Sequence, residues 1–156
     1  MGAGVRIITG NEDETAELAV RLADTLAPGD TVLLAGPVGA GKSVFARAIV
    51  QHLLGSSEDV PSPTFTLVQR YKVGERSLVH ADLYRLQNSL ELEETGILDE
   101  PEGTILLIEW PELLPGWMSD QALTVTIGLD GQRRIIDLSS AAPRWTSRLS
   151  ELADGS

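Results

Sequence analysis

The chain has no cysteine, few aromatic residues and fewer basic than acidic side chains. Zero Cys in 156 residues excludes a disulfide framework and a thiolate metal site, and it favours a cytoplasmic location. Three Trp, two Tyr and two Phe leave little material for stacking on nucleic-acid bases. The formal net charge of -11 would repel a phosphate backbone over most of the surface. We therefore expect that any nucleic acid is met only through a partner protein.

Long apolar runs are also missing. No stretch reaches the roughly 20 apolar residues that span a bilayer, and the first residues lack a basic-then-apolar targeting signal. We therefore expect no membrane association. The content of 42% hydrophobic and 22% charged residues is close to that of ordinary globular proteins. Together with the length, it predicts one domain over residues 1–156 without a linker.

Short apolar runs alternate with amphipathic stretches along the chain. Turn residues bound the runs that predict strands, at 5–9, 31–35, 66–73, 77–83, 103–109, 123–129 and 133–139. Helical spacing predicts helices from Asn11 to Leu26, from Gly41 to Leu54, around 89–95 and over 143–152. Asp130-Gly131 marks an antiparallel C-terminal hairpin, whereas 66–73 and 77–83 are either a hairpin or merely adjacent strands. The pattern predicts an α/β fold, with a mostly parallel sheet flanked by helices.

A phosphate-binding motif lies between the strand at 31–35 and the helix that follows it. Residues 36–43 match G-x-x-x-x-G-K-[ST] in full, in the strand-to-helix context that the motif requires. The predicted nucleotide-binding residues are Gly36, Pro37, Val38, Gly39, Ala40, Gly41, Lys42, Ser43 and Val44. Backbone N–H groups and the helix N-terminus would surround phosphate oxygens. Lys42 would neutralise the β- and γ-phosphates and the Ser43 hydroxyl would ligate Mg²⁺, which predicts a P-loop NTPase-like fold with ATP and Mg²⁺ as cofactors.

Two carboxylates stand at the ends of predicted strands. Asp82 follows the run 77–81, and Glu109 follows the apolar run 104–108. Side chains at the carboxyl ends of parallel strands converge on the ligand crevice, so both could complete a magnesium shell or orient a water. Taken alone, Asp82 could equally cap a turn and Glu109 could be a solvated residue where a strand emerges. The residues by themselves leave both interpretations open.

Taken together, these motifs resemble the TsaE (YjeE) family, the ATPase component of bacterial tRNA threonylcarbamoyladenosine synthesis. The resemblance covers 31–111 in order and spacing, and Thr15 and Arg134 match more loosely. It rests on the phosphate loop with Phe45, the run Ser62-Pro63-Thr64-Phe65-Thr66-Leu67-Val68, Tyr71, the run His80-Ala81-Asp82-Leu83-Tyr84-Arg85-Leu86, Gly96, and Glu109-Trp110-Pro111. Pro37 and Ser43 stand where the family often has Asp and Thr, and Ser43 keeps the ligating hydroxyl.

The resemblance implies roles for several of these residues. Ser43, Asp82 and Glu109 would hold Mg²⁺, and Glu109 would orient or deprotonate the attacking water. Thr64 would sit in a switch-like loop near the γ-phosphate, which makes Lys42, Thr64 and Glu109 the implied catalytic set. The implied partners are the TsaB and TsaD proteins, with tRNA reached only through their complex.

Other functions remain compatible with the same residues. A small-molecule P-loop kinase has this size, and a nucleotide-gated binding module with negligible turnover would share every residue named above. A GTPase is less favoured because the sequence has no Asn-Lys-x-Asp stretch for guanine. The pattern leaves open the roles of Trp110, Arg85 and Arg134, and it favours a packed or hydrogen-bonded His80 over a base.

Overall fold

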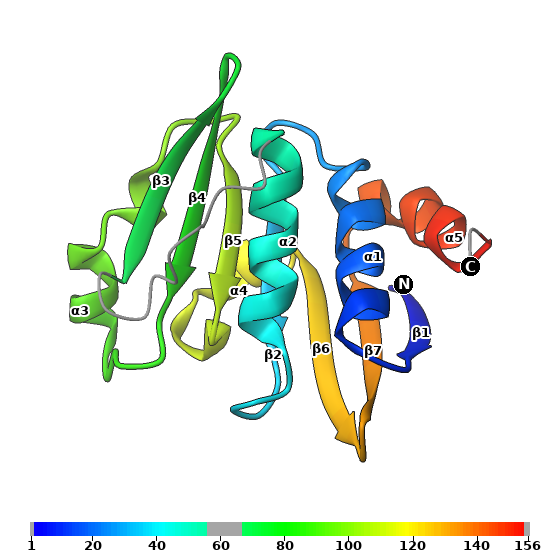
Figure 1. Ribbon diagram of the computed structural model, residues 1–156. Coiled ribbons are helices and arrows are strands. Elements are labelled where there is room, and N and C mark those ends of the chain that lie inside the picture. The colour runs from blue at the N-terminus through cyan, green and yellow to red at the C-terminus, as the bar shows by residue number, and fades with distance from the viewer. Residues whose placement is uncertain (1, 56–66, 155–156) are drawn as a thin grey trace.

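The protein is described by a computed structural model over residues 2–55 and 67–154, so the predicted switch residue Thr64 lies outside the described residues. One seven-stranded sheet has the order β1-β7-β6-β2-β5-β4-β3 (Figure 1). Its strands are β1 (Ala3–Thr9), β2 (Thr31–Ala35), β3 (Val68–Val73), β4 (Arg76–Asp82), β5 (Ile105–Glu109), β6 (Leu123–Asp130) and β7 (Arg133–Ser140). The helices of four or more residues are α1 (Glu12–Ala23), α2 (Lys42–Leu54), α3 (Ser89–Glu94), α4 (Gly116–Ser119) and α5 (Thr146–Asp154).

Parallel pairing is confined to the centre of the sheet. β2 pairs in parallel with β5 on one side and β6 on the other, and β5 pairs in parallel with β4. The predicted α/β sheet with an antiparallel C-terminal hairpin is confirmed by β6 and β7. Antiparallel pairing also occurs at both edges, β1 with β7 and β3 with β4, so the sheet is mixed and less parallel than expected. The open question about 66–83 is thereby settled, because β3 and β4 form a hairpin.

Local sequence signals set the ends of the two longest helices. The Asn11 side chain accepts a hydrogen bond from the Glu14 N–H at 2.9 Å, which caps the start of α1 as predicted. α1 ends at Ala23, before the predicted end at Leu26. There the Thr25 N–H and hydroxyl both donate to the Leu22 carbonyl, and these three-residue bonds replace the helical pattern before the turn. α2 ends at Gly55, whose φ of 68° is the left-handed conformation that stops a helix.

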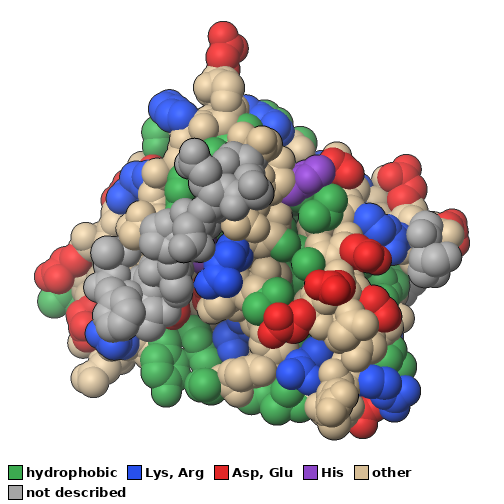
Figure 2. Space-filling view, viewed as in Figure 1, with side chains coloured by type: hydrophobic (Ala, Val, Ile, Leu, Met, Phe, Trp, Pro, Cys, Tyr) green, Lys and Arg blue, Asp and Glu red, His purple; other side chains and the backbone are tan. Residues whose placement is uncertain are grey.

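Long helices cover only one face of the sheet. α1 and α2 lie in front of it in Figure 1, and their apolar sides pack on a core that includes Leu22, Phe45, Ile49, Val125 and Trp145. The outer side of α1 is acidic (Figure 2), since its first two turns carry Glu12, Asp13, Glu14 and Glu17, all exposed. This face would repel phosphate groups.

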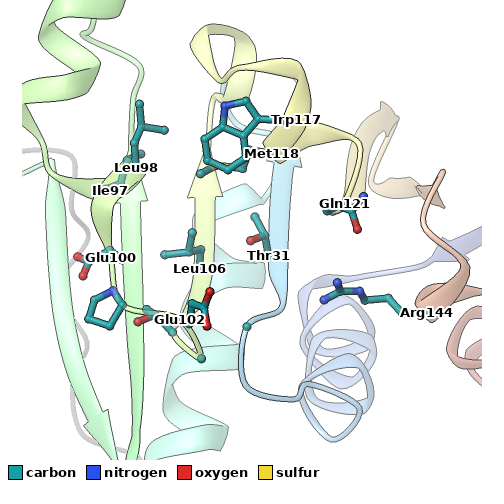
Figure 3. A pocket seen from close by; sticks show the side chains of 14 residues that line it. Thr31, Ile97, Leu98, Glu100, Glu102, Leu106, Trp117, Met118, Gln121 and Arg144 are labelled. Atoms are coloured by element: carbon teal, nitrogen blue, oxygen red, sulfur yellow. The ribbon is translucent and has the colours of Figure 1, made fainter.

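The opposite face of the sheet is covered by short elements. Buried residues such as Leu33, Ile108, Leu92 and Met118 form a second, smaller core there. Between residues 97–104 and α4 a hollow of about 370 Å³ remains, at the starts of β2 and β5 (Figure 3). Leu106 forms part of its lining, and the Trp117 side chain at its rim is 63% exposed. No helix of the described residues is both long and apolar enough to cross a membrane.

Candidate active site

The phosphate loop leaves β2 through a glycine that no other residue can replace without a clash. Gly36 has a φ of 132°, and a Cβ at this position would lie 2.2 Å from the Ile127 carbonyl oxygen of β6. At the other end of the loop Gly41 has a φ of 111°, and α2 begins at the next residue. The loop therefore needs glycine at Gly36 for close packing and at Gly41 for its backbone conformation.

Lys42 is buried inside the loop that it belongs to. The residue is only 5% exposed, and its Nζ donates to the carbonyl oxygens of Gly36 at 2.7 Å and Pro37 at 2.9 Å. The same Nζ lies 4.0 Å from the centroid of the Trp110 ring. Burial lowers the pKa of Lys42, and this effect outweighs the attraction of Glu109 and Asp82. The Lys42 ammonium group is thus held at the centre of the loop, where it could contact phosphate oxygens.

Ser43, Glu109 and His80 form a hydrogen-bonded chain beside this lysine. The Ser43 hydroxyl donates to Glu109 Oε1 at 3.2 Å, and His80 Nε2 lies 2.7 Å from Glu109 Oε2. The His80 and Glu109 side chains are each 2% exposed. Both oxygens of the Glu109 carboxylate are therefore occupied by different elements, α2 on one side and β4 on the other.

Asp82 joins the site from the neighbouring strand. It pairs directly with Glu109 in the parallel register of β4 and β5, which confirms that the two strand ends meet. Asp82 is 5% exposed, and its Oδ1 accepts from the Tyr84 N–H at 2.9 Å. The turn-capping interpretation of Asp82 is thus correct, and so is its placement at the crevice.

A cleft of about 390 Å³ collects most of the predicted residues. Those that line it are Val38, Gly39, Gly41, Lys42, Ser43, Val44, Asp82 and Glu109. The other predicted loop residues act through their backbone: Gly36 and Pro37 hold Lys42, and the Ala40 carbonyl accepts from Arg134 Nε at 2.9 Å. Arg134, a looser match in the sequence, is thereby placed against the phosphate loop.

Three further residues line this cleft, and the motifs alone did not assign them to it. Tyr84 and Trp110 lie against each other with ring centroids 4.8 Å apart and ring planes tilted by 47°, and Glu12 approaches from the start of α1. The sequence offered a weak signal for the two aromatics, because Trp110 directly follows Glu109 and Tyr84 stands two residues after Asp82. It offered none for Glu12, which reaches the cleft only because α1 packs beside α2.

The oxygen donors of the cleft suit a magnesium ion. Ser43, Asp82 and Glu109 offer a hydroxyl and two carboxylates, which are hard ligands, and Mg²⁺ is typically completed by phosphate oxygens and water. Among the described residues no three Asp, Glu or His side chains converge as a complete metal cage.

Comparison with known proteins shows which family the chain belongs to. The model of the family "Threonylcarbamoyl adenosine biosynthesis protein TsaE" matches residues 9–136. The TsaE protein of Rickettsia felis is 36% identical over 92% of this chain and 91% of its own length. That of Bacillus subtilis is 32% identical over 93% of this chain and 91% of its own. The crystal structure of Bacillus subtilis YdiB superposes with a TM-score of 0.76 at 27% identity, covering 99% of this chain and 97% of that one. The chain therefore belongs to the TsaE family, which takes part in the biosynthesis of tRNA threonylcarbamoyladenosine.

Proposed function

We propose that the chain binds ATP with Mg²⁺ and hydrolyses it as a component of tRNA threonylcarbamoyladenosine synthesis. The observation that carries the proposal is the meeting of three groups at one point. The phosphate loop presents Lys42, α2 presents the Ser43 hydroxyl, and β5 presents Glu109, whose Oε1 lies 3.2 Å from Ser43 Oγ. ATP is favoured over GTP because the sequence lacks the Asn-Lys-x-Asp stretch.

Each residue has a distinct part in this proposal. Backbone N–H groups of residues 36–44 bind the phosphates, and Lys42 leaves the Gly36 and Pro37 carbonyls to neutralise them. Ser43, Asp82 and Glu109 would hold Mg²⁺, which would supply positive charge against the negative charge of the phosphates. Glu109 orients or deprotonates the attacking water. Thr64 completes the proposed catalytic set from outside the described residues.

The proposed partners are the TsaB and TsaD proteins, and tRNA is reached only through their complex. The acidic surface of α1 supports this arrangement, because it would repel tRNA phosphates. The whole chain, residues 1–156, acts in this proposal as one P-loop ATPase domain in the cytoplasm, without a membrane.

The decisive experiment measures phosphate release from Mg-ATP by the full chain, alone and with TsaB and TsaD. Turnover is expected to appear or rise with the partners and to fall by about 100-fold or more in Lys42→Ala, because one preorganised charge at the phosphates is lost. Partner-independent turnover would count against the assembly, and phosphorylation of an added small molecule would replace hydrolysis by kinase activity. Tight ATP binding without any turnover would favour a nucleotide-gated binding module.

A further inference from the structure

His80 is a buried titratable side chain at the site, and the proposed ATP hydrolysis assigns it no role. It lies on β4 two residues before Asp82, so both side chains point to the same face of the sheet. The residue is 2% exposed, and its Nε2 lies 2.7 Å from Glu109 Oε2. Its other ring nitrogen, Nδ1, is buried and has no hydrogen-bond partner among the described residues.

This environment assigns the ring proton. A carboxylate oxygen accepts hydrogen bonds, so the Nε2 of His80, 2.7 Å from Glu109 Oε2, is the donor of this bond. The proton therefore belongs on Nε2, where it donates to Glu109. His80 is then a donor whose hydrogen bond is directed at one oxygen of the Glu109 carboxylate.

The two oxygens of Glu109 are consequently not equivalent. Oε2 is held in the protein interior by His80, whereas Oε1 faces Ser43 at the cleft. If Ser43 turned its hydroxyl to a cation, Oε1 would lose this hydrogen bond and could bind the cation or accept from a water, while His80 would still hold Oε2. A carboxylate held at one oxygen cannot rotate to exchange the two.

We propose that His80 is a positioning residue that fixes Glu109 so that only Oε1 takes part in magnesium binding and water orientation. This inference deepens the proposed ATPase function and rests on it. Second-sphere hydrogen bonds of this kind typically contribute 10- to 100-fold to activity or metal affinity.

Two amide substitutions test the position of the donor. In His80→Gln the side-chain nitrogen is as many bonds from Cβ as Nε2, so it can still reach Glu109. In His80→Asn the nitrogen is as many bonds from Cβ as Nδ1, so it cannot. His52→Gln is the matched control, because His52 is the other histidine and pairs with Asp24 at the surface, at 2.6 Å. The measurements are kcat and KM for ATP with TsaB and TsaD, the Kd of ADP with and without Mg²⁺ by calorimetry, and the unfolding midpoint.

His80→Asn is expected to lower kcat by about 10- to 100-fold and to abolish most of the Mg²⁺ enhancement of ADP affinity. The Kd of ADP without Mg²⁺ should not change, and His80→Gln and His52→Gln should stay within about threefold of the unmodified chain. Equal losses in His80→Gln and His80→Asn would overturn the proposal, because they would show a packing role. Normal kcat and normal Mg²⁺ enhancement in His80→Asn would overturn it as well.

A measurement without turnover separates this inference from the ATPase proposal. In ¹H–¹⁵N NMR of the unliganded chain, a His80 ring proton should appear on Nε2 and exchange slowly, and a ring without a proton on Nε2 would refute the assignment. If Lys42→Ala hydrolyses ATP as fast as the unmodified chain, the ATPase proposal fails. The effect of His80→Asn on the Mg²⁺ enhancement of ADP affinity then still tests whether His80 positions Glu109.

Discussion

Two buried carboxylates stand at opposite ends of the central strands, and their surroundings differ. Asp30, just before β2, is 1% exposed and accepts from Arg148 at 2.6 Å and from the Ala27 N–H at 2.7 Å. Arg144 adds an ion pair at 3.6 Å. Glu109, at the end of β5, is equally buried, but its partners among the described residues are the uncharged Ser43 and a histidine. Arginines thus pair directly with Asp30, whereas Glu109 has no hydrogen bond from Lys or Arg among the described residues, which supports its proposed role as a ligand of Mg²⁺.

The hollows at the two ends repeat this contrast. The hollow in Figure 3, about 370 Å³, and the cleft at the phosphate loop, about 390 Å³, are nearly equal in volume. Apolar side chains such as Leu106, Met118 and Trp117 form much of the first. The second contains Lys42 and three carboxylates. Volume therefore does not identify the site, and convergent buried charge does.

Exchanging each carboxylate for its amide should separate the two roles. Glu109→Gln is expected to reduce ATP turnover by about 100-fold or more, because a general base is lost, while nucleotide binding persists. Asp30→Asn is expected to cost about 3–5 kcal/mol of unfolding free energy, because Arg148 loses its charged partner, with kcat per folded molecule unchanged. Urea unfolding and steady-state kinetics check both. Normal hydrolysis by Glu109→Gln would contradict the assigned role.

Glycines at the two ends of β2 should differ in how much their replacement by alanine destabilises the fold. Gly36→Ala is expected to destabilise the fold by about 2–5 kcal/mol, since the new Cβ meets the Ile127 carbonyl in addition to a strained φ. Gly29 has a φ of 88°, but a Cβ added there would lie no closer than 3.9 Å to its nearest neighbour, Gly103 N. Gly29→Ala should therefore lower the free energy of unfolding by only about 1–2 kcal/mol. Chemical denaturation of both variants gives the comparison. Equal losses would show that the approach of β6 relaxes without cost.

The phosphate-loop end of the sheet could be predicted from the sequence because local sequence signals determine its structure. The motif at 36–43, with β2 before it and α2 after it, specifies its own backbone, and a strand end specifies where Asp82 and Glu109 stand. Contacts made by tertiary packing were not readable. His80 reaches Glu109 through the β4–β5 register, and Glu12 reaches the cleft through the packing of α1 on α2. The two-residue connection Gly74-Glu75, in which Gly74 has a φ of 62°, made a β3–β4 hairpin one of the two expected alternatives, and the pairing of the strands decided between them.

Two tryptophans offer a milder comparison of the hollows. Trp110→Ala should weaken ADP binding by about 3- to 10-fold, because the ring that lies 4.0 Å from Lys42 Nζ helps to hold the ammonium in the cleft. Trp117→Ala, at the rim of the other hollow, should leave ADP affinity unchanged. Calorimetric titration of ADP into each variant measures the difference. A loss of ADP affinity in Trp117→Ala would show that the two hollows are coupled.

The smallest expected effect is a pH dependence of the free energy of unfolding that arises from Lys42, at the phosphate-loop end of the sheet. Burial lowers the pKa of Lys42 below its ordinary value of 10.5, so the folded state releases this proton before the unfolded state does. Below the folded pKa the burial penalty is fully present. As pH rises from there towards 10.5 the unfolded chain binds more protons, and the free energy of unfolding contributed by Lys42 increases. The unfolding free energy of the unmodified chain minus that of Lys42→Met should therefore rise over this range. The corresponding difference for Arg148→Met should stay flat, because arginine keeps its proton. A flat or falling difference for Lys42 would mean that its carbonyl partners and carboxylates, rather than burial, dominate its charge.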